Sequence, residues 1–219
     1  MKNIRFKKLR LWLVYPVFFV YPLVADMTDL SFLMGMMFMV AGMGLRFWAS
    51  GYIQKSRVLA TSGPYAYTRN PLYLGNFIIG FGIVIISNSP GLIFYYVISF
   101  TILYLGTIYE EQKSLTEKFT DDYMDYLNEV PVFLPSYKAY RKTKGHKFDI
   151  RQSFKNGEFI RLCGFSLLIV FFYLWFVYRN GIEDFPGSRK FAIFLFLVFF
   201  ALLWFNIVQR RRRNKHEGR

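Results

Sequence analysis

Long apolar runs dominate this 219-residue chain, and their length limits the fold more strongly than any other feature. Most of the runs contain roughly 17–25 residues, the length that an α-helix needs to cross a bilayer. The composition agrees, because 54% of the residues are hydrophobic and 21% are aromatic, well above the usage of soluble proteins. We therefore predict an all-α, multi-pass membrane protein with about six transmembrane helices. The expected spans are 11–25, 30–52, 71–87, 91–109, 159–178 and 191–208.

Basic residues flank the apolar runs and predict the orientation of the chain. The net charge is +14, and Lys and Arg gather before the first span, in the 53–70 loop, in the 110–157 block and after the last span. The short turns at 26–29 and 87–91 contain neither residue. Because positive loops stay cytoplasmic, we expect both termini and both basic loops in the cytoplasm, at the inner membrane if the source is bacterial. The charge therefore indicates lipid headgroups as partners and not nucleic acid.

A polar segment, residues 63–75, interrupts the apolar pattern on the expected cytoplasmic side. Asn70 and Pro71 are residue types favoured at the N-cap and first position of a helix, so the third span is predicted to begin there. A helix start attracts a carboxylate or phosphate, and Arg69 adds a bidentate donor beside it. The alternative is that Asn-Pro only caps the helix and that Arg69 only sets the topology.

Three tyrosines and a glycine in the same segment also allow two interpretations. Tyr65, Tyr67 and Tyr73 could be ordinary anchors at the membrane interface, or their faces and hydroxyls could line a cationic or planar ligand. Gly75 could let two helices pack closely or let a ligand approach the backbone.

Two adjacent carboxylates, Glu110 and Glu111, follow the fourth span at the same expected side of the membrane. Carboxylates at a membrane boundary are costly and usually functional, so we predict one joint polar site with the 63–75 segment. The helix is expected to continue as a cytosolic amphipathic helix that lies on the membrane surface and closes over the loop carrying Arg69. Its apolar stripe, at spacings of four, four and three, consists of Leu115, Phe119, Tyr123 and Tyr126.

The remaining side chains exclude several kinds of chemistry. The single cysteine, Cys163, rules out an intramolecular disulfide and a multi-thiolate metal site. His146 and His216 lie in basic segments expected to be exposed, so no metal site and no Ser-His-Asp or Cys-His arrangement is predicted. An enzyme with these residues needs a reaction with little acid–base machinery. A displacement on an activated cofactor fits, because the protein then supplies mainly position and electrostatics.

The ordered motifs resemble those of the isoprenylcysteine carboxyl methyltransferase and phospholipid methyltransferase superfamily. These enzymes carry G-x-Y-x-x-x-R-[HN]-P-x-Y-x-G, then E-E, then F-x-x-x-Y-x-x-Y-x-x-x-V-P. The chain matches these elements from residue 63 to Pro131, within a similar region of about residues 50–136. The resemblance implies a multi-span membrane enzyme that holds S-adenosyl-L-methionine at the cytosolic boundary.

Carried onto this chain, the resemblance implies Arg69 and Glu111 as catalytic residues. The helix start and Arg69 would meet the cofactor carboxylate, although Arg69 could instead orient an acidic substrate, and Glu110 or Glu111 would meet the ammonium. The acceptor would be a lipidic or isoprenoid molecule, methylated on a carboxylate oxygen or a headgroup amine. The implied cofactor-binding residues are Tyr65, Tyr67, Asn70, Pro71, Leu72, Tyr73, Gly75, Glu110 and Glu111.

The chain departs from the usual pattern of the superfamily at three positions. Asn70 stands where many carboxyl methyltransferases have His, Thr120 replaces a common Gly, and Val132 replaces a common Arg. These differences weaken any transfer of substrate identity. Residues 1–140 are expected to form the methyltransferase core, and residues 141–219 a two-span extension without an assigned role.

Two other classes of protein remain as alternatives. A sterol-reductase-like membrane enzyme that uses NADPH has a similar R-x-P-x-Y-x-G loop but other residues at the position of Glu110 and Glu111. A non-catalytic membrane scaffold would be expected to show polar residues inside the spans or a repeated architecture.

Overall fold

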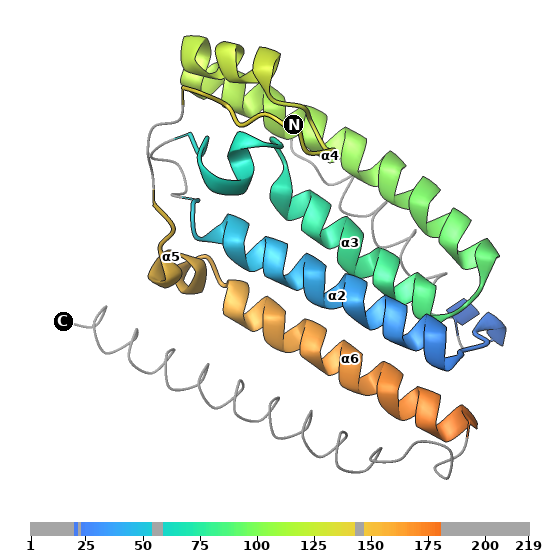
Figure 1. Cartoon of the computed structure of the whole chain (residues 1–219). Coiled ribbons are helices and arrows are strands. Elements are labelled where there is room, and N and C mark those ends of the chain that lie inside the picture. Colours follow the sequence, from blue (N-terminus) through green and yellow to red (C-terminus); the bar gives the residue numbers. More distant parts are fainter. Residues whose placement is uncertain (1–19, 22, 54–58, 143–146, 181–219) are drawn as a thin grey trace. The chain divides into compact units, whose positions relative to one another are not determined.

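The computed structural model describes residues 20–21, 23–53, 59–142 and 147–180, and every regular element in them is a helix (Figure 1). The described part contains no strand, which confirms the predicted all-α class. The chain divides into two compact units, Met1–Asn156 and Gly157–Arg219, and the candidate site lies within the first. The elements are α2 (Asp29–Ser50), the short 3-10 helix η1 (Gly63–Ala66), α3 (Pro71–Ile86), α4 (Pro90–Glu129), α5 (Ile150–Lys155) and α6 (Glu158–Asn180).

Three helices in the described part of the chain are long and apolar enough to cross a membrane: Asp29–Ser50, Pro90–Tyr109 and Glu158–Val177. These helices and the shorter apolar α3 occupy four of the six expected spans. Most of the expected span 11–25 and all of 191–208 lie outside the described residues. The number of spans therefore stays a prediction, as does the membrane-surface placement of the second half of α4.

Glycines hold the antiparallel helices α2 and α3 in close backbone contact. A Cβ atom added to Gly42 of α2 would lie 2.7 Å from the carbonyl oxygen of Gly75 in α3. One added to Gly82 would lie 2.5 Å from the carbonyl oxygen of Gly35. Both contacts are backbone atoms, which cannot move away without separating the helices. Glycine therefore fixes the distance between α2 and α3, as small residues do in membrane helix pairs.

The two short turns at the far end of these helices are tied together. The backbone N–H of Asp26 donates to the carbonyl of Ser87 (2.9 Å), and a reciprocal capping box between Thr28 and Ser31 starts α2. Asn88 has a φ of 52°, a left-handed conformation that Asn tolerates better than most residues. The expected tight turns at 26–29 and 87–91 are thus built from local capping and turn chemistry.

Aromatic rings fill the space between α3 and α4. The ring of Phe77 in α3 lies 5.8 Å from Tyr96 and 5.0 Å from Phe100, both in α4. Phe133, which follows α4, lies 5.7 Å from Phe77 and 6.1 Å from Phe100. A residue beyond the end of α4 therefore packs between two apolar helices.

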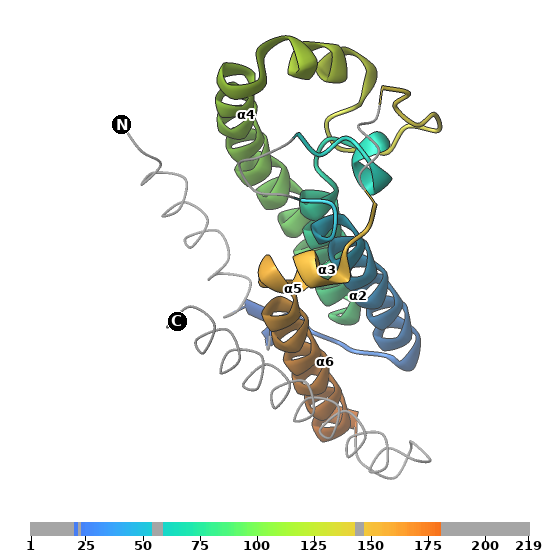
Figure 2. The same ribbon diagram turned by 90° about the vertical axis from the view of Figure 1, so that its left-hand side faces the viewer.

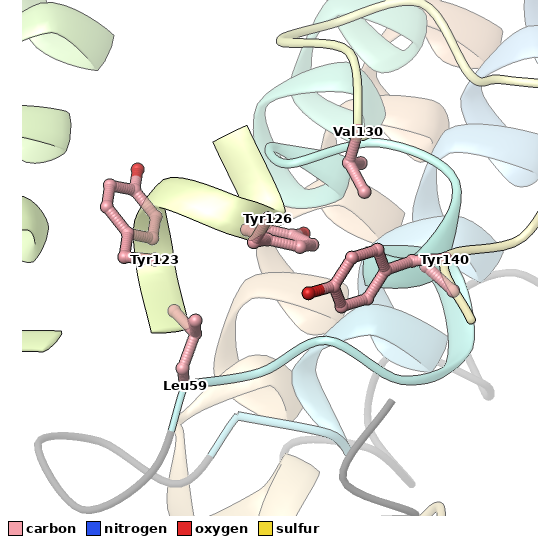
Figure 3. Close-up of a cluster of buried hydrophobic side chains, with 6 residues drawn as sticks. Leu59, Tyr123, Tyr126, Val130 and Tyr140 are labelled. Carbon is pink, nitrogen blue, oxygen red and sulfur yellow. The ribbon is translucent and has the colours of Figure 1, made fainter. Parts of the chain in front are cut away.

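The chain reverses direction near the end of α4, and residues 130–142 then run back along the 59–70 loop (Figure 2). We call residues 130–142 the return segment. Three backbone hydrogen bonds join them: Arg69 N–H to Pro131 (2.9 Å), Ser136 N–H to Tyr67 (2.8 Å) and Tyr140 N–H to Ala66 (2.9 Å). A buried cluster joins side chains of the 59–70 loop, the end of α4 and the return segment (Figure 3). It consists of Leu59, Ala66, Tyr123, Tyr126, Val130 and Tyr140, with Leu115 and Leu127 packed against it.

Candidate functional site

The structure brings together one residue from the 63–75 segment and one of the two predicted glutamates. The hydroxyl of Tyr73, in the first turn of α3, donates a hydrogen bond to Oε2 of Glu111 in α4 (2.8 Å). Glu111 lies just beyond Tyr109, where the apolar part of α4 ends. The hydroxyl therefore orients a carboxylate at the end of the apolar helices.

Arg69 approaches the same place through Tyr123. The Tyr123 side chain is buried, and this burial raises the pKa of its hydroxyl. Arg69 acts against this shift through its charge and a side-chain hydrogen bond, whereas the negative charge of Glu111 raises the Tyr123 pKa further. Arg69 and Glu111, which are far apart in sequence, thus act on the Tyr123 hydroxyl in opposite directions.

One atom of Arg69 has unused hydrogen-bonding capacity. Its Nε is buried and has no hydrogen-bond partner among the described residues. Buried donors are almost always paired in proteins, so such a donor is suited to an acceptor supplied by a bound molecule. The main chain at Arg69 is fixed by the return segment, which holds this donor in place.

The predicted start of α3 at Asn70 and Pro71 is confirmed, but the Asn70 side chain does not cap the helix. Its Nδ2 donates instead to the carbonyl of Val132 (2.9 Å), and the Asn70 backbone (φ −127°, ψ 55°) is not extended as at a usual N-cap. The neighbouring Thr68 makes a parallel contact, from Oγ1 to the carbonyl of Phe133 (2.8 Å). The Asn70 side chain, which the sequence predicted to cap α3, therefore binds the return segment instead.

The other predicted residues take several positions. The Tyr65 side chain is buried and its carbonyl accepts from the Tyr126 hydroxyl (2.6 Å), whereas the Tyr67 side chain is exposed. The Leu72 carbonyl accepts from Arg46 (3.3 Å). A Cβ on Gly75 would lie 2.5 Å from Cγ of Arg46, so Gly75 serves helix packing.

Glu110 lies within α4, but its side chain is outside the described residues. The described part of the chain also contains no group of three His, Cys, Asp or Glu side chains that could hold a metal ion.

Sequence reasoning missed a buried polar network inside the apolar helices. Arg46 of α2, only 5% exposed, donates from Nη1 to Oδ1 of Asn76 in α3 (2.6 Å). Nδ2 of Asn76 donates to the hydroxyl of Tyr104 (3.3 Å), whose ring lies 4.9 Å from that of Tyr73. A charged residue within an expected span is by itself a signal of function. Arg46 gave that signal within the 30–52 run.

The segment that contains these residues is similar to known methyltransferases. Residues 30–122 match the family described as phospholipid methyltransferase. The chain is 31% identical over 86 residues to protein-S-isoprenylcysteine O-methyltransferase of Xenopus laevis, over 39% of this chain and 30% of that protein. These matches confirm the resemblance to this superfamily for α2, α3 and most of α4. No solved structure matches the chain.

Two bacterial relatives match a similar length of the chain. Nickel-cobalt-cadmium resistance protein NccN of Alcaligenes xylosoxydans xylosoxydans is 33% identical over 98 residues, 44% of this chain and 46% of NccN. Cobalt-zinc-cadmium resistance protein CzcN of Cupriavidus metallidurans is 31% identical over 98 residues, 44% of this chain and 45% of CzcN. The matched region thus spans a little under half of either protein.

Proposed function

We propose that this protein is an integral membrane methyltransferase that uses S-adenosyl-L-methionine and acts on a lipidic or isoprenoid acceptor. The observation that carries the proposal is the hydrogen bond from the Tyr73 hydroxyl to Glu111 (2.8 Å), which joins the 63–75 segment containing Arg69 to the polar part of α4. Tyr73 and Glu111 both lie within residues 30–122, which match the phospholipid methyltransferase family. The acceptor atom would be a carboxylate oxygen or a headgroup amine.

The residues at the site fit the proposed cofactor. The amino-acid part of S-adenosyl-L-methionine carries an ammonium and a carboxylate, so its binding needs one anion and one cation. Glu111 offers the anion, oriented by Tyr73. Arg69 offers the cation, with a buried Nε that has no hydrogen-bond partner in the described part of the chain. When bound, the cofactor would supply an activated methyl group on its sulfonium. Tyr65, Tyr67, Pro71 and the start of α3 would form the surrounding wall.

The protein's own contribution would be position and electrostatics. The return segment fixes the main chain at Arg69 through the hydrogen bond to Pro131. The hydroxyl of Tyr73 limits the rotation of the Glu111 carboxylate. Charges that are held before the reaction need not reorganise during it, and this is a large source of rate enhancement. Arg69 could serve the acceptor instead of the cofactor if the acceptor is a carboxylate.

Binding measurements on the full chain in lipid nanodiscs test the proposal. We expect binding of S-adenosyl-L-methionine and none of NADPH. Glu111→Gln should weaken that binding about tenfold, which corresponds to about 1.4 kcal/mol. Glu129→Gln is the control, because Glu129 is an exposed acid at the end of the same helix. Binding of NADPH alone, or an unchanged affinity in Glu111→Gln, would contradict the proposal.

Arg69→Gln separates the two possible roles of the arginine. Loss of affinity for S-adenosyl-L-methionine assigns Arg69 to the cofactor, whereas normal affinity with a raised KM for the acceptor assigns it to the acceptor. The acceptor itself can be found by incubating lipid extracts with a methyl-labelled cofactor and identifying the labelled lipids by mass spectrometry. An O-methyl ester or an N-methyl amine in the product identifies the acceptor atom.

We also propose six spans with both termini and the site in the cytoplasm, and a functional core within residues 1–140. The absence of Lys and Arg from the turns at 26–29 and 87–91 supports this orientation. A cysteine introduced at exposed Asn88 should react with a membrane-impermeant maleimide from outside intact cells. A cysteine at exposed Glu129 should react only after the cells are opened.

A further inference from the structure

The return segment exposes two large side chains that do not suit water. Leu134 is 73% exposed and Tyr137 is fully exposed. Both lie in the return segment, three residues apart. Exposed large apolar side chains often mark a contact with another protein or with a membrane.

Hydrogen bonds at the neighbouring residues hold the main chain that carries Leu134 and Tyr137. The carbonyl of Phe133 accepts from Thr68, and the N–H of Ser136 donates to the carbonyl of Tyr67. The exposed residues therefore belong to a segment that is attached to the 59–70 loop by its own main chain. The same set of backbone hydrogen bonds also holds the main chain of Arg69.

Packing of Phe133 indicates the depth of this segment. Its ring contacts Phe77, which lies about 9 Å along α3 from Pro71 at about 1.5 Å per residue. It also lies beside Phe100, about 14 Å before the end of the apolar part of α4 at Tyr109 on the same measure. Phe133 therefore lies within the length of the apolar helices. The main chain at Phe133 is level with the start of α3, because its carbonyl accepts from Thr68, three residues before Pro71. Its neighbour Leu134 therefore emerges near the end of the apolar helices.

The charge of the segment is complementary to an anionic lipid surface. Residues 131–142 contain Lys138, Arg141 and Lys142 and no Asp or Glu. All three basic residues are exposed, although Lys142 also pairs with Asp125 (2.6 Å). Basic side chains beside an apolar anchor bind the headgroups of anionic lipids.

We propose that the return segment docks on the anionic surface of the bilayer. Leu134 and Tyr137 enter the boundary between headgroups and acyl chains, and Lys138 and Arg141 bind lipid phosphates. This contact is independent of the reaction proposed above, because it rests on exposure, depth and charge alone. Its consequence is that the loop carrying Arg69 is held at the level of the headgroups.

Spin labels on the full chain in nanodiscs test this contact. Single cysteines replace Leu134 or Tyr137 in a Cys163→Ser background, and collisions with oxygen and with a water-soluble nickel chelate are measured by power saturation. Ile98→Cys, exposed on the apolar part of α4, gives the value for lipid, and Glu129→Cys gives the value for water. Both target side chains are exposed, so their replacement leaves the packed core intact.

We expect the labels at 134 and 137 to collide with the nickel chelate at least threefold less often than the label at 129. Raising the phosphatidylserine content from none to about one third should lower this collision rate further. Combined Lys138→Glu and Arg141→Glu should abolish that dependence on phosphatidylserine. Nickel accessibility equal to that at 129 in both lipid mixtures would overturn the proposal and leave the surface to a protein partner.

Discussion

The close contact between α2 and α3 leads to a sharp prediction for two glycines in the same helix. A Cβ at Gly42 would lie 2.7 Å from the carbonyl oxygen of Gly75 and 2.9 Å from the backbone nitrogen of Ile79. Ordinary contacts of a Cβ begin at 3.4 Å, so α3 would have to move away by about 0.7 Å. At Gly44 a Cβ meets nothing within 4 Å, so Gly44→Ala is a matched control.

The two substitutions should have opposite effects on stability. Alanine gains up to about 1 kcal/mol over glycine in a helix, which Gly44→Ala should show in part. Gly42→Ala gains the same helix propensity but loses about 1–3 kcal/mol of stability to overpacking. It also stretches the neighbouring hydrogen bond between Arg46 and Asn76. We therefore expect the two variants to differ by about 2 kcal/mol in unfolding free energy.

Thermal unfolding of the purified protein in one detergent, followed by intrinsic fluorescence, measures this difference. For a chain of this size about 2 kcal/mol corresponds to a separation of roughly 4–8 °C between the two Tm values. Gly42→Ala should unfold below the wild type and Gly44→Ala at or above it. Equal Tm values for the two variants would refute the view that backbone contact at Gly42 holds the helices together.

Further predictions concern the hydrogen bonds around the site. Tyr73→Phe should weaken binding of S-adenosyl-L-methionine about threefold by titration calorimetry, because the carboxylate of Glu111 loses its donor. Tyr126→Phe removes the hydroxyl that donates to the carbonyl of Tyr65, so the free energy of unfolding should fall by about 1–3 kcal/mol in a denaturation experiment. Arg46→Leu should lower the free energy of unfolding by at least as much as Tyr126→Phe, and Arg46→Lys should lower it less. Equal stability of the wild type and both Arg46 variants would contradict a structural role for the buried charge.

The helices could be predicted well from the sequence because their signals are local. Run length placed α2, α4 and α6. The Asn70-Pro71 step placed the start of α3 at the correct residue. Each of these signals depends on residues within one helix.

The details of the site could not be predicted, because they depend on partners distant in sequence. From local sequence Asn70 is expected to cap α3 with its side chain. In the structure that side chain binds the carbonyl of Val132, which is 62 residues away. Gly75 is a plausible ligand contact until Arg46 is found packed against it. The expected orientation brought the 63–75 segment and the Glu110-Glu111 pair to one membrane boundary, but it could not pair Tyr73 with Glu111.

The return segment also sets an order of assembly for the growing chain. Arg69, Tyr73 and Glu111 all leave the ribosome before residue 140, yet the backbone bonds that close the 59–70 loop from outside involve Pro131, Ser136 and Tyr140. A nascent chain halted at Glu129 would therefore carry every charge of the site with an unclosed loop. Synthesis of the last residues of the return segment is therefore the step at which the 59–70 loop is first fixed in place.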